Sequence, residues 1–192
     1  MPPATAGSTL SLMAPRLVDI AVASVVAGTV ETPAGVVRVA VGAGPGGEAV
    51  TDAAIGATVE DFAARLSLRH GAAAGRPGPG GLLREVLAML DGYFRGEPVP
   101  FDVPVDPGGT PFRRRVWSVL VSIPRGEVRT YAEVARMAGS PGGFRAVGGA
   151  CGANPVPVII PCHRVVASAG PGGYSGGLGV KRTLLAIEGV EI

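Results

Sequence analysis

The sequence has few of the residues that build disulfide frameworks or metal sites. It contains two cysteines, Cys151 and Cys162, and two histidines, His70 and His163, in 192 residues. There is no CxxC pair and no spaced set of Cys and His residues, so we expect no metal site. Two cysteines in a chain of this length do not make a disulfide framework, which is typical of a protein of the reducing cytoplasm.

Long hydrophobic runs are missing as well. No stretch approaches the ~20 apolar residues that a membrane span needs, so we expect no membrane partner. The most apolar segment, residues 21–30, resembles the core of a signal peptide, but Asp19 interrupts its start and only Arg16 precedes it. The β-branched residues that recur through it favour a strand instead.

Charged residues are scarce, at 17% of the chain against 47% hydrophobic residues, so the chain should fold rather than stay disordered. Lys181 is the only lysine beside 16 arginines, a bias that we attribute to genome composition. Residues 1–110 carry 7 basic and 11 acidic side chains, whereas residues 111–192 carry 10 basic and 4 acidic ones. A basic C-terminal part suggests an anionic partner, nucleic acid first. A solvated basic face is the alternative, and charge alone slightly favours it.

The first half of the chain is predicted to be an α/β supporting domain, residues 17–96, behind a flexible leader, residues 1–16. Two β-rich runs within residues 18–41 flank residues 31–35, where a proline and then a glycine supply the turn. This pattern predicts a β-hairpin.

Two helices and a linker follow. Apolar residues at helical spacing predict helices over residues 58–68 and 82–94, separated by a glycine- and proline-rich loop at residues 75–81. Residues 97–109 contain four prolines and two glycines, and are predicted to be the linker to a second domain.

Residues 110–192 are predicted to form a mostly helical C-terminal domain. Thr110 is an N-cap followed by proline, which begins a helix that ends before Pro124. A second helix starts at Thr130 and a third opens at Ser140, which together predict a helix-turn-helix. The second helix is predicted to point three side chains inward, those of Tyr131, Val134 and Met137.

The third helix is informative because of what it lacks. Beyond Arg145 it offers only Ala, Val, Gly and Cys up to Cys151, so no side chain could make bidentate contacts to base edges. A helix this smooth can lie close to another surface. If that surface is DNA, the groove would be read by shape, with Arg145 as the one intruding side chain. A helix–helix contact through small residues is the alternative, which this helix alone would favour.

The chemistry of the chain is concentrated in residues 154–166. An apolar β-type stretch delivers Cys162 and His163 at a proline turn. A thiolate is the nucleophilic form of cysteine, and a basic partner raises its population. Adjacent side chains rarely bond directly, so a bridging water is expected between them. Cys151 has no such neighbour and is expected to be a small buried hydrophobe.

The imidazole of His163 would need a third group to hold its orientation. Glu188 is one of only four acids in the basic half and is the natural candidate. A surface carboxylate near the end of the last helix is the alternative, and on general grounds it is the commoner case.

Six sequence blocks between residues 110 and 189 resemble the O6-alkylguanine-DNA alkyltransferase family. In order they read GTPFRRRVW, IPRGEVRTYAEVA, RAVGGA, NPVPVIIPCHRVV, GGYSGG and LLAIEG. The resemblance of residues 1–95 is loose and lies in the hairpin and the YFRG helix end. It implies an N-terminal ribonuclease-H-like domain of sheet and helices, and a C-terminal domain that contains the helix-turn-helix.

The resemblance implies roles for the matching positions. Cys162 would accept the alkyl group, with His163 and Glu188 activating it through a water and Asn154 holding the active-site turn. The guanine pocket would be lined by Tyr131, Val165, Tyr174 and Ser175. The helix that contacts DNA would present Arg145, Ala146, Gly148 and Gly149, with Arg145 replacing the flipped nucleotide in the base stack.

Three features depart from the family pattern. The stretch of residues 166–173 is often one residue longer in members of the family, which bears on the lid of the pocket and on substrate size. Gly152 stands where some relatives have an arginine, which implies weaker contact with DNA. Residues 1–150 contain no cysteine, so the zinc ligands of some relatives are absent.

The chain is therefore predicted to be an α/β protein that transfers a methyl or small alkyl group from O6-alkylguanine, and by extension O4-alkylthymine, to Cys162. It would act once, as a monomer, on double-stranded DNA containing alkylated bases, and without a cofactor. Three alternatives are a non-catalytic alkyl-lesion-binding protein, a cysteine hydrolase and a helix-turn-helix regulator. The presence of Cys162 disfavours the first, and the side-chain-poor third helix disfavours the last.

Overall fold

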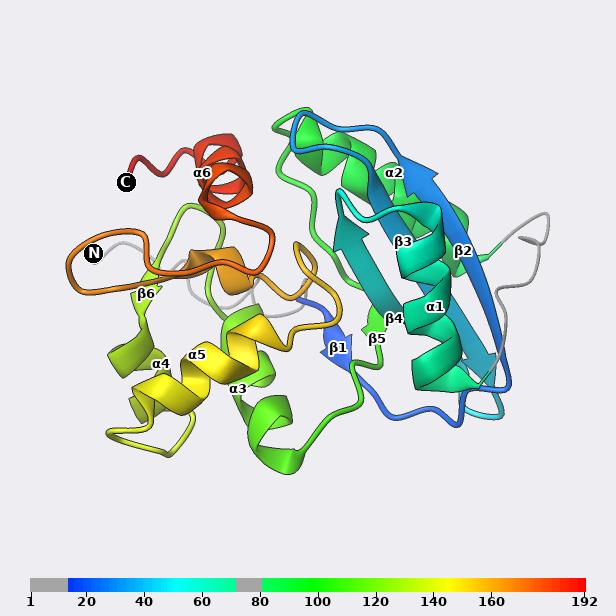
Figure 1. Ribbon diagram of the computed structural model, residues 1–192, viewed down its shortest axis with the longest axis horizontal. Coiled ribbons are helices and arrows are strands. Elements are labelled where there is room, and N and C mark those ends of the chain that lie inside the picture. The colour runs from blue at the N-terminus through cyan, green and yellow to red at the C-terminus, as the bar shows by residue number, and fades with distance from the viewer. Residues whose placement is uncertain (1–13, 72–80) are drawn as a thin grey trace, which may run out of the picture.

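The computed structural model describes residues 14–71 and 81–192. Two halves lie side by side: a five-stranded sheet with helices on its two faces, and a group of C-terminal helices (Figure 1). The chain is of the mixed α/β class that the sequence predicts. Residues 1–13 of the predicted leader and most of the predicted loop at residues 75–81 lie outside the described residues.

The sheet has the strand order β1-β5-β4-β3-β2. Its antiparallel part consists of β2 (Ser24–Val30), β3 (Val37–Gly44) and β4 (Gly47–Ile55). The predicted hairpin is confirmed: Val30 pairs with Val37, and Gly35 has a φ of 105° in the turn.

Two short strands complete the sheet where the sequence predicts none. β1 (Arg16–Leu17) pairs in parallel with β5 (Pro104–Val105), and β5 also pairs with β4. The predicted leader therefore stops short of Arg16, and residues 97–109 supply a strand as well as joining the two halves. The four prolines of this segment argue against a strand in the sequence. Its buried residues nevertheless alternate as in a strand: Phe101, Val103 and Val105.

Helices α1 (Val59–His70) and α2 (Leu82–Phe94) pack on the two faces of the sheet. Thr58 begins α1 by accepting a hydrogen bond from the amide of Asp61, and Gly71, with a φ of 64°, ends it. The prediction for α2 is confirmed at both ends, and α1 extends two residues beyond its predicted end.

Four helices and a pair of short strands make up the other half. Thr110 accepts a hydrogen bond from the amide of Arg113 to begin α3, and Thr130 and Glu133 form a capping box at the start of α4. The helices are α3 (Pro111–Val121), α4 (Tyr131–Met137), α5 (Phe144–Gly152) and α6 (Leu178–Ile187). The strands β6 (Arg129–Thr130) and β7 (Val165–Val166) pair in parallel.

Two predictions for this half are wrong in detail. Met137 is 51% exposed instead of pointing inward, and Ala138 fills the buried position next to it. The third helix begins at Phe144 and not at Ser140, because Ser140 accepts a hydrogen bond from Gly143 across a turn in which Gly142 has a φ of 88°.

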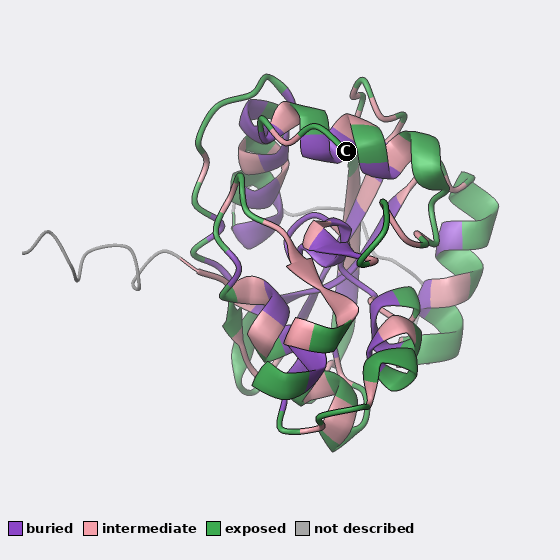
Figure 2. Cartoon of the chain, turned by 90° about the vertical axis from the view of Figure 1, so that its left-hand side faces the viewer, coloured by how far each residue is buried: buried purple, intermediate pink, exposed green. Residues whose placement is uncertain are grey.

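One cluster of buried residues runs from the sheet into the C-terminal helices. Trp117 of α3 is buried in it, and its Nε1 donates to the carbonyl of Ala150 at 3.0 Å. A smaller cluster lies beneath α1. Figure 2 shows the buried residues inside and the exposed residues on the outward faces of the helices. Within residues 14–71 and 81–192, no helix is long and apolar enough to cross a membrane.

Leu90 is fully buried in the large cluster, so Leu90→Ala should lower the free energy of unfolding by about 2–5 kcal/mol. Leu68 on α1 is 89% exposed, and Leu68→Ala should change it by less than about 0.5 kcal/mol. Denaturant titration of both variants measures the difference. Equal losses would show that α2 is not part of the main core.

Candidate active site

Cys162 begins a 3-10 turn, η2 (Cys162–Arg164), which follows a tight and strained segment. Val158 in this segment has a φ of 75°, which is rare for a β-branched residue. The side chain of Asn154 bridges the segment: its Oδ1 accepts from the amide of Val156 at 3.0 Å, and its Nδ2 donates to the carbonyl of Ile160 at 2.8 Å. The side chain of Asn154 thus bonds to both ends of residues 154–162, which are named the active-site turn.

The sulfur of Cys162 is buried and accepts a hydrogen bond. Its residue is 4% exposed, and Nδ2 of Asn154 lies 3.1 Å from Sγ. Burial raises the pKa of the thiol, while the Asn154 hydrogen bond and the charge of Lys181 oppose that rise without cancelling it. The thiol is therefore protonated at neutral pH. Removal from water outweighs the stabilising groups, and the expected effect of the neighbouring imidazole stays a prediction.

His163 and Glu188 form a buried pair. Nε2 of His163 lies 2.8 Å from Oε1 of Glu188. Burial lowers the pKa of His163, although Glu188 raises it, so the ring is neutral at pH 7. A neutral ring that donates from Nε2 to the carboxylate keeps Nδ1 as an acceptor. Nδ1 is buried and has no hydrogen-bond partner among the described residues.

Glu188 is also bonded by Arg164 and Tyr93. Arg164 donates from Nε to Oε2 at 2.8 Å and from Nη2 to Oε1 at 2.9 Å, and the Tyr93 hydroxyl donates to Oε1 at 2.8 Å. Burial alone would raise the pKa of Glu188, but the hydrogen bonds and charges of His163 and Arg164 hold it below its usual value. The carboxylate is ionised, and it is buried rather than on the surface. Sequence reasoning missed Tyr93, which lies 95 residues from Glu188 and has no local signal.

Lys181 supports the loop that follows Cys162. Its fully buried side chain donates from Nζ to the carbonyl oxygens of Val165 at 2.5 Å, Pro171 at 2.5 Å and Gly173 at 3.3 Å. Burial lowers the pKa of Lys181. The lone lysine among 16 arginines was the available sequence signal, which we attributed to composition.

The predicted pocket residues lie around this loop. The hydroxyl of Tyr131 donates to the carbonyl of Gly173 at 3.2 Å, and burial raises its pKa. The hydroxyl of Tyr174 is buried, and that burial raises its pKa. Ser175 is exposed. Beside them is a cavity of about 250 Å³, whose lining includes Asn154, Pro157, Tyr174, Ser175 and Gly176.

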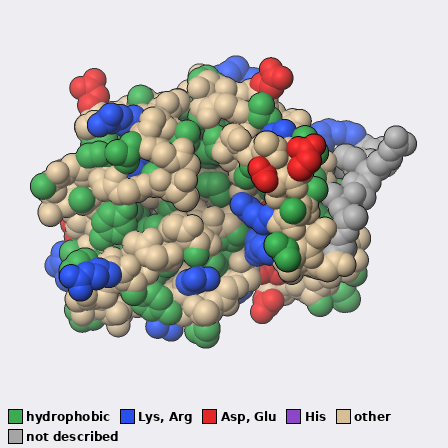
Figure 3. All heavy atoms as spheres, in the orientation of Figure 1, with side chains coloured by type: hydrophobic (Ala, Val, Ile, Leu, Met, Phe, Trp, Pro, Cys, Tyr) green, Lys and Arg blue, Asp and Glu red, His purple; other side chains and the backbone are tan. Residues whose placement is uncertain are grey.

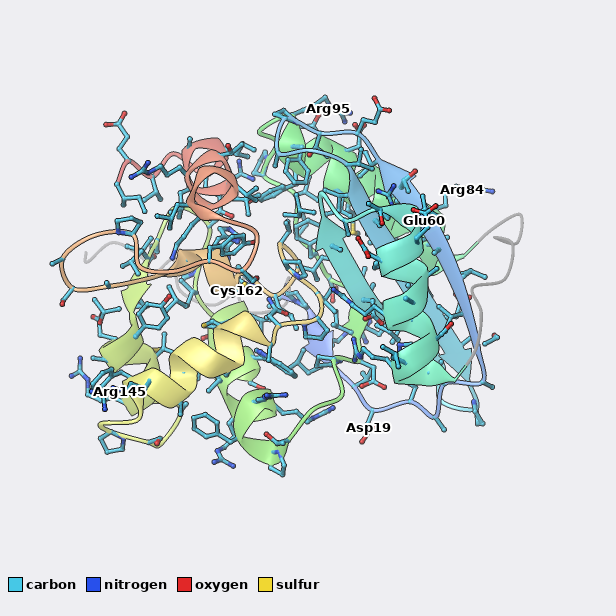
Figure 4. The ribbon with its side chains drawn as sticks, in the orientation of Figure 1. Asp19, Glu60, Arg84, Arg95, Arg145 and Cys162 are labelled. Atoms are coloured by element: carbon cyan, nitrogen blue, oxygen red, sulfur yellow. The ribbon has the colours of Figure 1, made fainter. Side chains whose placement is uncertain are left out.

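The predicted DNA-contacting residues are separate from this cluster and lie along α5. Arg145, Ala146 and Gly149 are exposed, and Gly148 is half-buried. Figure 4 shows Arg145 at the outer end of α5, directed away from Cys162. The guanidinium of Arg145 lies 5.6 Å from the ring centre of Phe144, which is 46% exposed. On the face shown in Figure 3, acidic side chains gather mainly over the sheet half.

Of the predicted residues, Asn154 bonds to the sulfur of Cys162, and Glu188 bonds to His163, the next residue in the chain. No group of three or more His, Cys, Asp or Glu residues in the described part of the chain could hold a metal ion. The arrangement offers one buried nucleophile, one neutral base and one ionised carboxylate.

Residues 111–190 match the model of the family described as 6-O-methylguanine DNA methyltransferase, DNA binding domain. The methylated-DNA–protein-cysteine methyltransferase of Mycobacterium leprae is 48% identical over 109 residues, which are 56% of this chain and 66% of that protein. The sequence match thus spans just under two thirds of that relative's length.

Solved structures extend the similarity into the sheet half. The crystal structure of Mycobacterium tuberculosis O6-methylguanine methyltransferase is 38% identical, covers 85% of this chain and 92% of that one, and has a TM-score of 0.70. The structure of Mycobacterium tuberculosis OGT in complex with DNA is 34% identical with the same coverage and a TM-score of 0.68. With the sequence and the fold in agreement, the chain belongs to the O6-methylguanine-DNA methyltransferase family.

Proposed function

We propose that this chain repairs DNA by moving a methyl or small alkyl group from O6-alkylguanine to Sγ of Cys162. The observation that carries the proposal is the buried Sγ on the active-site turn, with the Asn154 amide at 3.1 Å and with the next residue in the chain, His163, paired with Glu188. Relatives named as methylated-DNA–protein-cysteine methyltransferases support it.

The transfer is an in-line displacement at the alkyl carbon. The S–C bond forms as the C–O6 bond breaks, and the electron pair of that bond leaves with the guanine. The proton of the thiol passes through a water to Nδ1 of His163, and Glu188 stabilises the imidazolium. The hydroxyl of Tyr131, or backbone amides of the loop that carries Tyr174 and Ser175, would donate a hydrogen bond to the leaving base. The thioether has no good leaving group, so each molecule reacts once, and no cofactor takes part.

Duplex DNA is the proposed partner. A stacked base cannot reach a buried sulfur, so the nucleotide has to be turned out of the helix. α4 and α5 would act as a helix-turn-helix, with the smooth face of α5 in the minor groove and Arg145 filling the space that the nucleotide leaves. Residues 17–96, with a ribonuclease-H-like arrangement, would support residues 110–192, and one copy would suffice.

The first test is stoichiometry. After incubation with a duplex that contains O6-methylguanine, intact-protein mass spectrometry should show one added methyl group per molecule, and peptide mapping should place it on Cys162. Cys162→Ser should abolish the transfer, and Cys151→Ser should retain it. Methyl transfer to Cys151, or product in excess of protein, would contradict the assignment.

The second test concerns Arg145. Arg145→Ala should slow repair of duplex DNA by about tenfold to a hundredfold, because extruding the nucleotide costs a few kcal/mol. The reaction with free O6-benzylguanine, which needs no extrusion, should stay within about twofold.

Arg95→Ala, at the exposed end of α2, is the matched control and should change neither rate (Figure 4). Equal losses on both substrates would mean that Arg145 serves the pocket or the fold.

The third test uses pH. The pKa of the Cys162 thiol is raised and that of the His163 imidazole is lowered, so both groups are uncharged at neutral pH. Between the lowered imidazole pKa and the raised thiol pKa both groups stay neutral, so the rate of reaction with free O6-benzylguanine should stay nearly constant from pH 7 to 8. Glu188 raises the pKa of His163, so Glu188→Gln makes the ring a weaker base.

Glu188→Gln should therefore slow the reaction by about a hundredfold across this range, in line with loss of general-base catalysis. Tyr93→Phe removes one hydrogen bond from Glu188 but leaves its charge, and should cost much less. A Glu188→Gln profile that overlays the wild type would remove the relay and leave positioning as the source of reactivity.

A further inference from the structure

The side chain of Arg65, in the middle of α1, reaches from the sheet half to the active-site turn. Its Nη2 donates to the carbonyl oxygens of Pro155 at 2.7 Å and Ala53 at 2.8 Å. The Pro155 oxygen also accepts a hydrogen bond from the amide of Ala53 at 2.7 Å. The residue that follows Asn154 is thus held by two donors from the other half of the chain.

The guanidinium of Arg65 is itself fixed by a buried carboxylate. Asp52 of β4 is fully buried, and its Oδ1 lies 3.1 Å from Nε of Arg65. The same carboxylate is bonded by Arg69 at 2.5 Å and by His70 at 2.8 Å. Charge-assisted hydrogen bonds are stronger than neutral ones, and the planar fork of an arginine is oriented by them. Asp52 therefore directs the free edge of the guanidinium toward Pro155.

The active-site turn needs support from outside because it is strained. The positive φ of Val158 persists only where the surroundings over-determine the backbone. Asn154 supplies hydrogen bonds within the turn, whereas Arg65 holds its start. The cavity of about 250 Å³ is lined by Arg65, Asn154 and Tyr174, so packing alone does not fix this side of the turn.

We propose that Arg65 is a positioning residue for alkyl transfer, which acts through the Pro155 carbonyl to hold the Asn154 amide against the sulfur of Cys162. The proposal rests on the proposed function, because the alkyl group is taken up by that sulfur. Without Arg65 the Pro155 oxygen keeps only the Ala53 amide. The turn then shifts toward the cavity and carries the donor of Asn154 away from Sγ. The sheet half of the protein thereby sets the geometry of a reaction that takes place in the other half.

The experiment compares Arg65→Leu and Arg65→Lys with Arg69→Leu. Arg69 shares Asp52 with Arg65, and its other bonds go to the carbonyls of Thr51 and Pro107, away from the turn. Single-turnover reaction with free O6-benzylguanine gives the limiting rate and the half-saturating concentration for each variant. Transfer from duplex DNA and the melting temperature are measured on the same proteins, at temperatures well below every melting point.

Arg65→Leu should lower the limiting rate about tenfold or more on both substrates, since a displacement of ~1 Å can cost ~100-fold. The half-saturating concentration should stay within about twofold, because the predicted pocket residues Tyr131, Tyr174 and Ser175 are unchanged. Arg65→Lys should recover part of the rate, since an ammonium can reach the Pro155 oxygen without the fork. Arg69→Leu should lower the melting temperature as much as Arg65→Leu but keep the rate within about twofold.

Equal rate losses in Arg65→Leu and Arg69→Leu would overturn the proposal and leave general destabilisation as the cause. A wild-type rate in Arg65→Leu would overturn it as well. If Arg65→Leu does not fold, Arg65→Lys decides: a wild-type limiting rate overturns the proposal, and a reduced one at unchanged half-saturation supports it. Failure of the proposed function is separate, since it would appear as wild-type Cys162 taking no alkyl group from duplex DNA.

Discussion

The hydrogen bonds and ion pairs of the buried Glu188 carboxylate connect the parts of the chain that form the candidate site. The carboxylate joins three parts of the chain: Tyr93 at the end of α2, His163 and Arg164 in η2, and the end of α6. Arg164 also donates to the carbonyl of Ile123, just after the end of α3, at 2.6 Å. Breaking a buried ion pair on one side typically costs about 3–5 kcal/mol, because the remaining charge stays buried and unpaired. The carboxylate that contacts His163 is therefore also a main connection between the two halves of the protein.

The remaining supports hold the sulfur from two sides. On the turn side, Asn154 donates to Sγ and to the backbone of the same turn. On the loop side, Lys181 gathers three carbonyl oxygens and closes the loop against β7. These bonds are made before any substrate arrives. The site is thus preorganised, and no solvent has to rearrange around the sulfur during the reaction.

The sequence was sufficient wherever local pattern decides structure. The boundaries of α2 and the turn of the first hairpin follow from periodicity and from a proline–glycine pair, and the Cys162–His163 dipeptide is visible directly. Long-range pairing was out of reach. β5 lies in a proline-rich segment and pairs with β4, which is far away in the sequence. The partners of Lys181 are main-chain oxygens, which every residue type has, so the sequence does not identify them. The scarcity of acids singled out Glu188, yet neither its burial nor its bond to Tyr93 has a local signal.

The pKa of Cys162 is raised, whereas the pKa of a reactive cysteine is usually lowered. A resting thiolate is attacked by oxidants and electrophiles in proportion to its population and exposure. Under the proposed transfer each molecule is alkylated only once, so such a side reaction would remove its whole function. Burial keeps the sulfur protonated and covered, with 4% of the residue exposed. In the proposed transfer, the neutral His163 would remove the proton when a substrate brings the alkyl carbon to the sulfur. In that proposal, reactivity is conditional on occupancy of the pocket, which is the selectivity that a single-use acceptor requires.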